Sequence, residues 1–234
     1  MRLVIFKGLL PGLFLLPIGV VLAAEPGSRP AAAPWTDSFT TRLEALALLQ
    51  SLNADLLSHD SATLTLERWC GAHRLATPAT ITAERIRDVD KQPTVEQREL
   101  LAVSATEPVK YRRVRLRCGS RVLSEADNWY VPARLTPAMN LALDSSDVPF
   151  GRAVQALQYR RRTLSAKLLW SPLPEGWEVA APTRMPGSPT LEVPPQVLQH
   201  QAVLALPDGT PFSQVVETYT ADVLGFPEPS QPQR

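Results

Sequence analysis

Glu217 is the residue whose type fits its local pattern least well. It lies in a β-rich stretch at residues 212–220, where strand alternation sets Val215, Glu217 and Tyr219 on one side. A strand side with such neighbours usually packs into a core, where an ionised carboxylate is costly unless it is paired. Glu217 is therefore a candidate for proton exchange or ligand contact, and the alternative is an edge-strand carboxylate facing water.

Arginines recur at every second position of another predicted strand. Arg113, Arg115 and Arg117 share one side of it, and the other side carries Val114, Leu116 and Cys118. A guanidinium group binds a carboxylate through two parallel hydrogen bonds, so this side could hold an anion or could simply be solvated. The run at residues 160–162, which is also all arginine, is interpreted as a solvated surface run.

The cysteines and histidines do not indicate a metal site. Cys70 and Cys118 either form one disulfide or remain two buried thiols, and the sequence leaves both alternatives open. The three histidines, His59, His73 and His200, show no ligand spacing. We expect neither a metal nor a cofactor.

The first residues are typical of an export signal. Arg2 and Lys7 give a positive start, residues 9–22 carry no charge, and small residues precede Glu25. We expect residues 1–24 to be a signal peptide and the protein to be exported, most simply to a periplasm. An uncleaved membrane anchor over residues 8–24 is the alternative.

The remaining elements predict an α+β fold, an antiparallel β-sheet with helices packed on it, because helices and hairpins alternate without a βαβ rhythm. A linker at residues 25–36 precedes one domain at 37–226, which a tail at 227–234 follows. Within the domain we expect helices at 41–58, 60–71, 137–143 and from 150, strands at 79–87 and 159–170, hairpins at 111–132 and 200–220, and a proline-rich surface insertion at 171–197.

Charge and motifs exclude several function classes. The net charge of +1 argues against nucleic acid as a partner, because phosphate binding needs a marked basic excess. The sequence has no glycine-rich phosphate loop, nucleophile elbow, CxxC or HExxH motif. We expect a small-molecule partner and no membrane contact beyond the signal segment.

Four stretches, taken in order, resemble the chorismate pyruvate-lyase family. They are residues 60–63 at a predicted helix start, residues 111–132, residues 148–152 and residues 216–218. The resemblance runs from about residue 48 to residue 219 and is interrupted by the proline-rich insertion. It implies the chorismate lyase-like fold and an enzyme that eliminates pyruvate from chorismate, or from a related enolpyruvyl compound, to leave 4-hydroxybenzoate.

The resemblance also implies roles for individual residues. The family's substrate arginine falls on Arg113 and the carboxylate at the ring hydroxyl falls on Glu217, so the two should meet in one enclosed pocket. Ala62 and Phe150 would contribute backbone amides, and Ala62 does lie at a predicted helix N-terminus, which favours an anion. The alternative function is a non-catalytic exported binder of a small aromatic or carboxylated ligand on the same fold.

Overall fold

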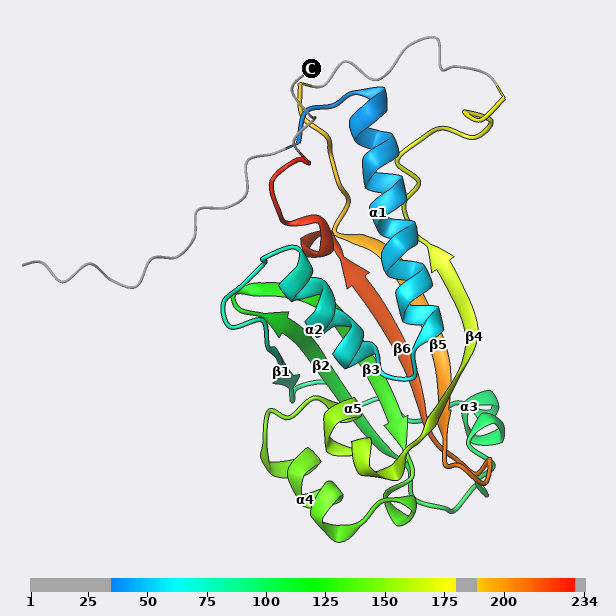
Figure 1. The fold of residues 1–234 in the computed structure, drawn as a ribbon. Coiled ribbons are helices and arrows are strands. Elements are labelled where there is room, and N and C mark those ends of the chain that lie inside the picture. The colour runs from blue at the N-terminus through cyan, green and yellow to red at the C-terminus, as the bar shows by residue number, and fades with distance from the viewer. Residues whose placement is uncertain (1–34, 180–188, 230–234) are drawn as a thin grey trace, which may run out of the picture. The chain divides into compact units, whose positions relative to one another are not determined.

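The computed structural model describes residues 35–179 and 189–229 (Figure 1). The predicted signal peptide at residues 1–24 lies outside them, as do residues 25–34 of the linker, residues 180–188 of the insertion and residues 230–234 of the tail. No helix among the described residues combines the length and the apolar character needed to cross a bilayer.

The described chain is built on one six-stranded sheet in which every neighbouring pair is antiparallel. In chain order its strands are β1 (Ile81–Ile86), β2 (Lys110–Cys118), β3 (Arg121–Tyr130), β4 (Arg160–Leu168), β5 (Gln196–Ala205) and β6 (Pro211–Thr220). Their order across the sheet is β1-β2-β3-β6-β5-β4, so the two hairpins meet where β3 pairs with β6. The predicted α+β architecture is confirmed.

Two longer helices, α1 (Phe39–Ser58) and α2 (Ala62–Ala72), lie on the same face of the sheet (Figure 1). Each begins at a serine whose hydroxyl accepts from a first-turn amide, Ser38 from Thr41 and Ser61 from Leu64. The shorter helices α4 (Pro137–Ser145) and α5 (Phe150–Ala153) follow β3 in the chain. The face that these helices cover is called the helix face below.

The core lies between the helix face and α1 and α2. Ala45, Leu49, Leu52 and Leu56 form the buried stripe of α1 at helical spacing. They belong to one cluster with strand residues such as Val114, Leu116, Leu198 and Tyr219. Full burial of each leucine stabilises the fold by about 1.5–3 kcal/mol, so this packing fixes the helices on the sheet.

The opposite face of the sheet is largely open. A short helix absent from our expectations, α3 (Val95–Leu100), covers part of it, starting at a capping box between Thr94 and Gln97. Beside it Leu101, Trp129 and Val131 form a small buried cluster. This face is called the open face.

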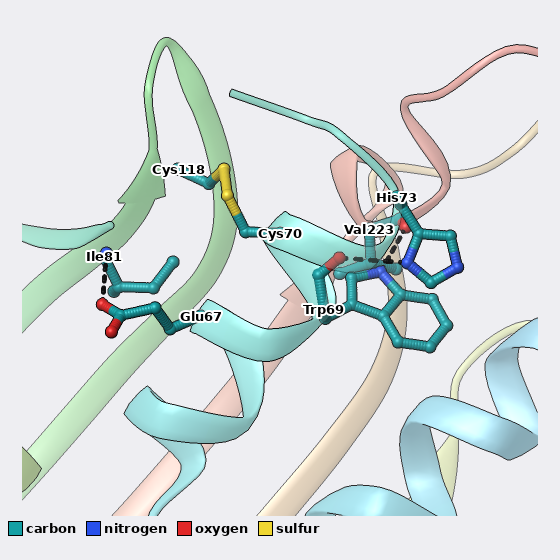
Figure 2. The surroundings of a disulfide bond; sticks show 7 residues. All are labelled: Glu67, Trp69, Cys70, His73, Ile81, Cys118 and Val223. Atoms are coloured by element: carbon teal, nitrogen blue, oxygen red, sulfur yellow. Dashed lines mark hydrogen bonds between the residues drawn. A yellow bond between two sulfur atoms is a disulfide. The ribbon is translucent and has the colours of Figure 1, made fainter. Parts of the chain in front are cut away.

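A disulfide joins the helix layer to the sheet (Figure 2). It links Cys70 near the end of α2 to Cys118 at the end of β2, which is one of the two states that the sequence left open. Two hydrogen bonds from the same helix support this attachment: Trp69 Nε1 donates to the Val223 carbonyl at 2.9 Å, and Glu67 accepts from the Ile81 amide at 3.0 Å.

The packed domain reaches beyond its expected limits. Trp35, placed in the linker, is buried and donates to the Phe226 carbonyl at 2.8 Å. Glu228, placed in the tail, accepts from the Thr36 amide at 2.9 Å. Leu173 and Leu191, near the two ends of the proline-rich segment, are buried, so those ends do not simply run over the surface.

Candidate functional site

Residues from several elements enclose a cavity on the helix face. It lies near the start of α2, which is close to α5 (Figure 1). We call it the central cavity. Its volume is about 40 Å³, measured as the space open to the centre of a water molecule, so it suits a small ligand. Its walls are Asp60, Ala62, Thr63, Arg112, Val114, Leu116, Ala126, Asn128, Phe150, Gly151, Tyr159, Arg161, Leu204, Val215 and Glu217.

A buried ion pair forms part of the cavity wall. Arg161 Nη2 of β4 lies 2.5 Å from Glu217 Oε2 of β6, and their side chains are only 4% and 8% exposed. Tyr219 donates to the same oxygen at 3.3 Å. Burial acts to lower the pKa of Arg161, but the charge of Glu217 prevails and raises it, so Arg161 remains a cation.

A second buried arginine in the wall makes no ion pair with the described residues. Arg112 of β2 is 2% exposed and donates through Nη2 to the Val148 carbonyl at 3.0 Å. Its Nε has no hydrogen-bond partner, and it takes part in no ion pair with any described residue. Burial, with the nearby charges of Arg85 and Arg87, lowers its pKa to about 10, although Tyr130 and Asp147 act in the opposite direction, so Arg112 is still charged at neutral pH. A buried cation without an anion is costly, and an anionic ligand would remove that cost.

The start of α2 and the approach of α5 shape the other wall. The first amides of α2 have no acceptor within the helix, and Ala62 and Thr63 line the cavity there. Gly151 allows a close approach, because a Cβ at that position would lie 3.0 Å from the Tyr159 hydroxyl and 3.3 Å from the Thr63 hydroxyl. Asp60 fixes β4 beside them by accepting from the Arg161 amide at 2.7 Å.

A buried histidine lies beside the ion pair on the neighbouring strand. His200 of β5 is opposite Glu217 in the strand register and fully buried. Its Nε2 lies 2.8 Å from Asn53 Oδ1 of α1; because that oxygen only accepts, the neutral ring carries its proton on Nε2. Burial lowers the pKa of His200 to about 4.

The structure brings three of the four expected site residues together and separates the fourth. Ala62, Phe150 and Glu217 line the central cavity. Arg113 does not: it points to the open face, where it lies 3.2 Å from Glu125 and 3.9 Å from Asp127. The expectation that Arg113 and Glu217 converge is wrong. Glu217 and Arg112 both line the central cavity, and Arg113 follows Arg112 on β2, so its side chain points to the opposite face.

The other strand arginines of the open face are paired in the same way. Arg115 contacts both Glu84 and Glu125, and Arg117 lies 2.6 Å from Glu84. These ion pairs form a charged ladder across β1, β2 and β3. They leave the arginines on this side occupied by the protein's own carboxylates.

Sequence reasoning missed Arg112 and Arg161. The alternation that set Arg113, Arg115 and Arg117 on one side of β2 also puts Arg112 with Val114 on the apolar side. Arg161 was counted within a solvated run, but only its neighbours Arg160 and Arg162 are exposed. Side chains alternate between the two faces of a strand, so the middle residue of this run points away from its two neighbours, and this signal could have identified Arg161. Among the described residues no group of histidine, cysteine and acidic side chains could hold a metal ion.

The fold and the site together define an α+β protein with an arginine-lined cavity between a helix layer and an antiparallel sheet. No family model matches the sequence. The chain is 54% identical over 217 residues to the uncharacterized protein y4mC of Sinorhizobium fredii (strain NBRC 101917 / NGR234), covering 89% of this chain and 92% of that protein. It therefore belongs to the same family as y4mC.

Several solved structures resemble this one in part. PhnF from Mycobacterium smegmatis has a TM-score of 0.45 at 12% identity, over 75% of this chain and 70% of that one. The effector domain of the same protein has 0.42 at 13% identity, over 64% and 88%. A Bacillus subtilis protein described as a possible transcriptional regulator, YydK, has 0.38 at 16% identity; the match covers 65% of this chain and only 62% of that protein.

Proposed function

We propose that this protein binds a small organic anion in the central cavity, with a carboxylate of the ligand at Arg112. The observation that carries the proposal is the state of Arg112, a buried cation that lines the cavity and has no acidic partner among the described residues. Its planar guanidinium matches a carboxylate through paired hydrogen bonds. The ligand would supply the missing charge.

The other charges of the cavity wall already have partners. Arg161 is neutralised by Glu217, and Asp60 lies 3.4 Å from the exposed Arg160. Arg112 is thus the charged wall residue that makes no ion pair with any described residue, and the charge of Asp147 acts on it without a direct contact. A ligand with one carboxylate fits this arrangement, and a cationic ligand does not.

The rest of the wall indicates the remainder of the ligand. Val114, Leu116, Ala126, Val215 and Leu204 are apolar, and Phe150 adds an aromatic ring. Apolar walls with a few polar groups are typical of small-molecule sites. An aromatic or otherwise apolar body with a single carboxylate is the ligand class that this cavity supports best.

A second candidate is catalysis of the chorismate pyruvate-lyase type. The observation that favours it is that Glu217, Ala62 and Phe150, three positions that the sequence resemblance implies, line one cavity. In that reaction the ether bond between ring and enolpyruvyl group breaks, the ring carbon that bears the hydroxyl loses a proton and the ring becomes aromatic, and the released enolate takes up one proton at its methylene carbon to become pyruvate. Arg112, in place of Arg113, would hold a carboxylate, and the free Oε1 of Glu217 would face the ring hydroxyl.

One paired experiment separates these two functions. The full-length chain is titrated with 4-hydroxybenzoate by calorimetry and, separately, incubated with chorismate while 4-hydroxybenzoate release is followed by absorbance. Saturable binding at one molecule per chain without release supports the binder. Release above the uncatalysed rate supports the lyase, and neither binding nor release would contradict the proposal for this ligand class.

We further propose that the protein is exported to an oxidising compartment. Two features support this: the signal-like residues 1–24, and a Cys70–Cys118 disulfide, since such bonds persist mainly outside the cytosol. An exported binder needs no chorismate supply from the cytosol. Location and the binding function are therefore consistent with each other.

A further inference from the structure

Three arginines gather on the helix face where β1 ends. Arg85 of β1 pairs with Val114, two positions from Arg112 on β2. The register pairs Ile86 with Arg113, so continuing it by one residue sets Arg87 opposite Arg112. Diagonal and direct neighbours in an antiparallel pair lie within reach of long side chains, so the three guanidinium groups face a common region.

A groove opens at this point. Its volume, measured as the space open to the centre of a water molecule, is about 320 Å³, and that of the central cavity is about 40 Å³ by the same measure. Its walls include Arg85, Arg87, Arg112, Tyr111 and Asp90. Arg112 lines both the groove and the central cavity, and Arg85, Arg87 and Arg113 line only the groove. Arg113 is already held by Glu125 and Asp127.

The positive charge of the groove is only partly balanced, by Asp90 in its wall and by Asp147, whose charge acts on Arg112. Arg85 donates to the carbonyls of Leu143 and Asp144, which are neutral acceptors, and the Asp144 carboxylate is held by Lys110 at 2.7 Å. Arg87 is exposed and takes part in no ion pair within the described part of the chain. Like charges gathered in this way repel one another unless an anion lies between them.

We propose that this groove is a second anion-binding site, for a phosphate-type oxyanion, held by Arg85, Arg87 and Arg112. A tetrahedral oxyanion offers acceptors in several directions, so it can be shared by three guanidinium groups. A planar carboxylate is satisfied by one or two of them. The groove site goes beyond the ligand of the central cavity, because two of its three arginines do not line that cavity.

The test is a titration of the full-length chain with inorganic phosphate at constant ionic strength, followed by ¹H–¹⁵N NMR. We expect saturable shifts concentrated at residues 85–90, with acetate at least tenfold weaker at the same residues; Arg112 is not used as a reporter, because it also lines the central cavity. Arg85→Gln and Arg87→Gln should each weaken phosphate binding about tenfold or more. Arg162→Gln, an exposed arginine on the opposite edge strand, is the matched control and should leave it unchanged.

Each other outcome has a clear meaning. Tighter binding of phenyl phosphate than of inorganic phosphate supports the site and assigns it to the phosphate group of a larger molecule; the reverse order assigns it to free phosphate. Shifts that do not saturate, or an equal loss in Arg162→Gln, would overturn the proposal as general surface attraction. Failure of 4-hydroxybenzoate to bind the central cavity leaves this result unaffected, because Arg87→Gln reports on the groove alone.

Discussion

The chemistry of this protein depends on which face of a strand each arginine takes. Arg112 and Arg113 are neighbours in the sequence, yet one lines the central cavity and the other joins an ion-pair ladder on the open face. Similarly, Arg161 is buried against Glu217 while Arg160 and Arg162 are exposed. Residue type alone therefore does not identify a ligand contact in this sheet.

Glu217 tests the buried ion pair. Glu217→Gln removes the only carboxylate that the Arg161 guanidinium contacts among the described residues and leaves a buried cation, so we expect the free energy of unfolding to fall by about 3–5 kcal/mol. Adding Arg161→Met should restore at least half of the loss, because the uncompensated charge is then gone. Urea unfolding measures both variants, and a loss below about 1 kcal/mol in the single variant would contradict a tightly coupled pair.

His200 should make stability depend on pH. Its pKa is lowered by burial to about 4, against about 6.5 in an unfolded chain, so between these values the unfolded chain binds the proton and the folded chain does not. Stability should therefore fall as the pH is lowered, by about 2 kcal/mol between pH 7 and pH 5 from this residue. Glu217 and Arg161 are the charged groups that act on the ring, with opposite effects.

The control for this prediction is His200→Gln, whose amide can still donate to Asn53 but does not titrate. Urea unfolding of both proteins at the two pH values isolates the contribution of the histidine. If the variant keeps the full slope, the pH dependence comes from other groups.

The residues of the site show how much of it could be predicted from the sequence. Glu217 was found because one carboxylate broke an apolar pattern, whereas Ala62 was implied by the family resemblance, with which its place at a predicted helix start agrees. Arg112 was missed because the family resemblance placed the substrate arginine one position later, and a shift of one residue moves a side chain to the other face. The strand pattern itself already set Arg113 on the side away from Val114.

At the scale of elements, the parts with local signals were predicted and the part without them was not. The hairpin at β2 and β3 follows from two alternating runs around Gly119, and α1 from its leucine spacing. The helix α3 is only six residues long and has no buried residue, so no apolar periodicity marks it. The pairing of β3 with β6 joins residues about ninety positions apart, which no local pattern encodes.

The disulfide should stabilise the attachment of α2 to the sheet. It closes a separation of 48 residues, which corresponds to up to about 4 kcal/mol of lost chain entropy in the unfolded state. We expect dithiothreitol to lower the free energy of unfolding by about 2–4 kcal/mol. The matched control is Cys70→Ala with Cys118→Ala, which should be insensitive to the reductant; an equal response in the control would show that the reductant acts elsewhere.

For the whole molecule, the export proposal makes a prediction about residues 1–34. Residues 1–34 are fused to the N-terminus of an alkaline phosphatase that is active only after export. The fusion should give phosphatase activity in a bacterial host. Arg2→Glu with Lys7→Glu should reduce that activity, because a signal peptide needs a positive start. Activity that is absent in the unchanged fusion would contradict export.

The central claim is that a carboxylate binds at Arg112, and a comparison of two adjacent arginines tests it most directly. Calorimetry with 4-hydroxybenzoate is carried out on the wild type, on Arg112→Met and on Arg113→Met, with thermal unfolding of each. The account predicts that Arg112→Met loses binding at least tenfold while its stability is unchanged or higher, because a buried uncompensated charge has been removed. Arg113→Met should bind as the wild type does; loss of binding in Arg113→Met, with binding intact in Arg112→Met, would contradict the account.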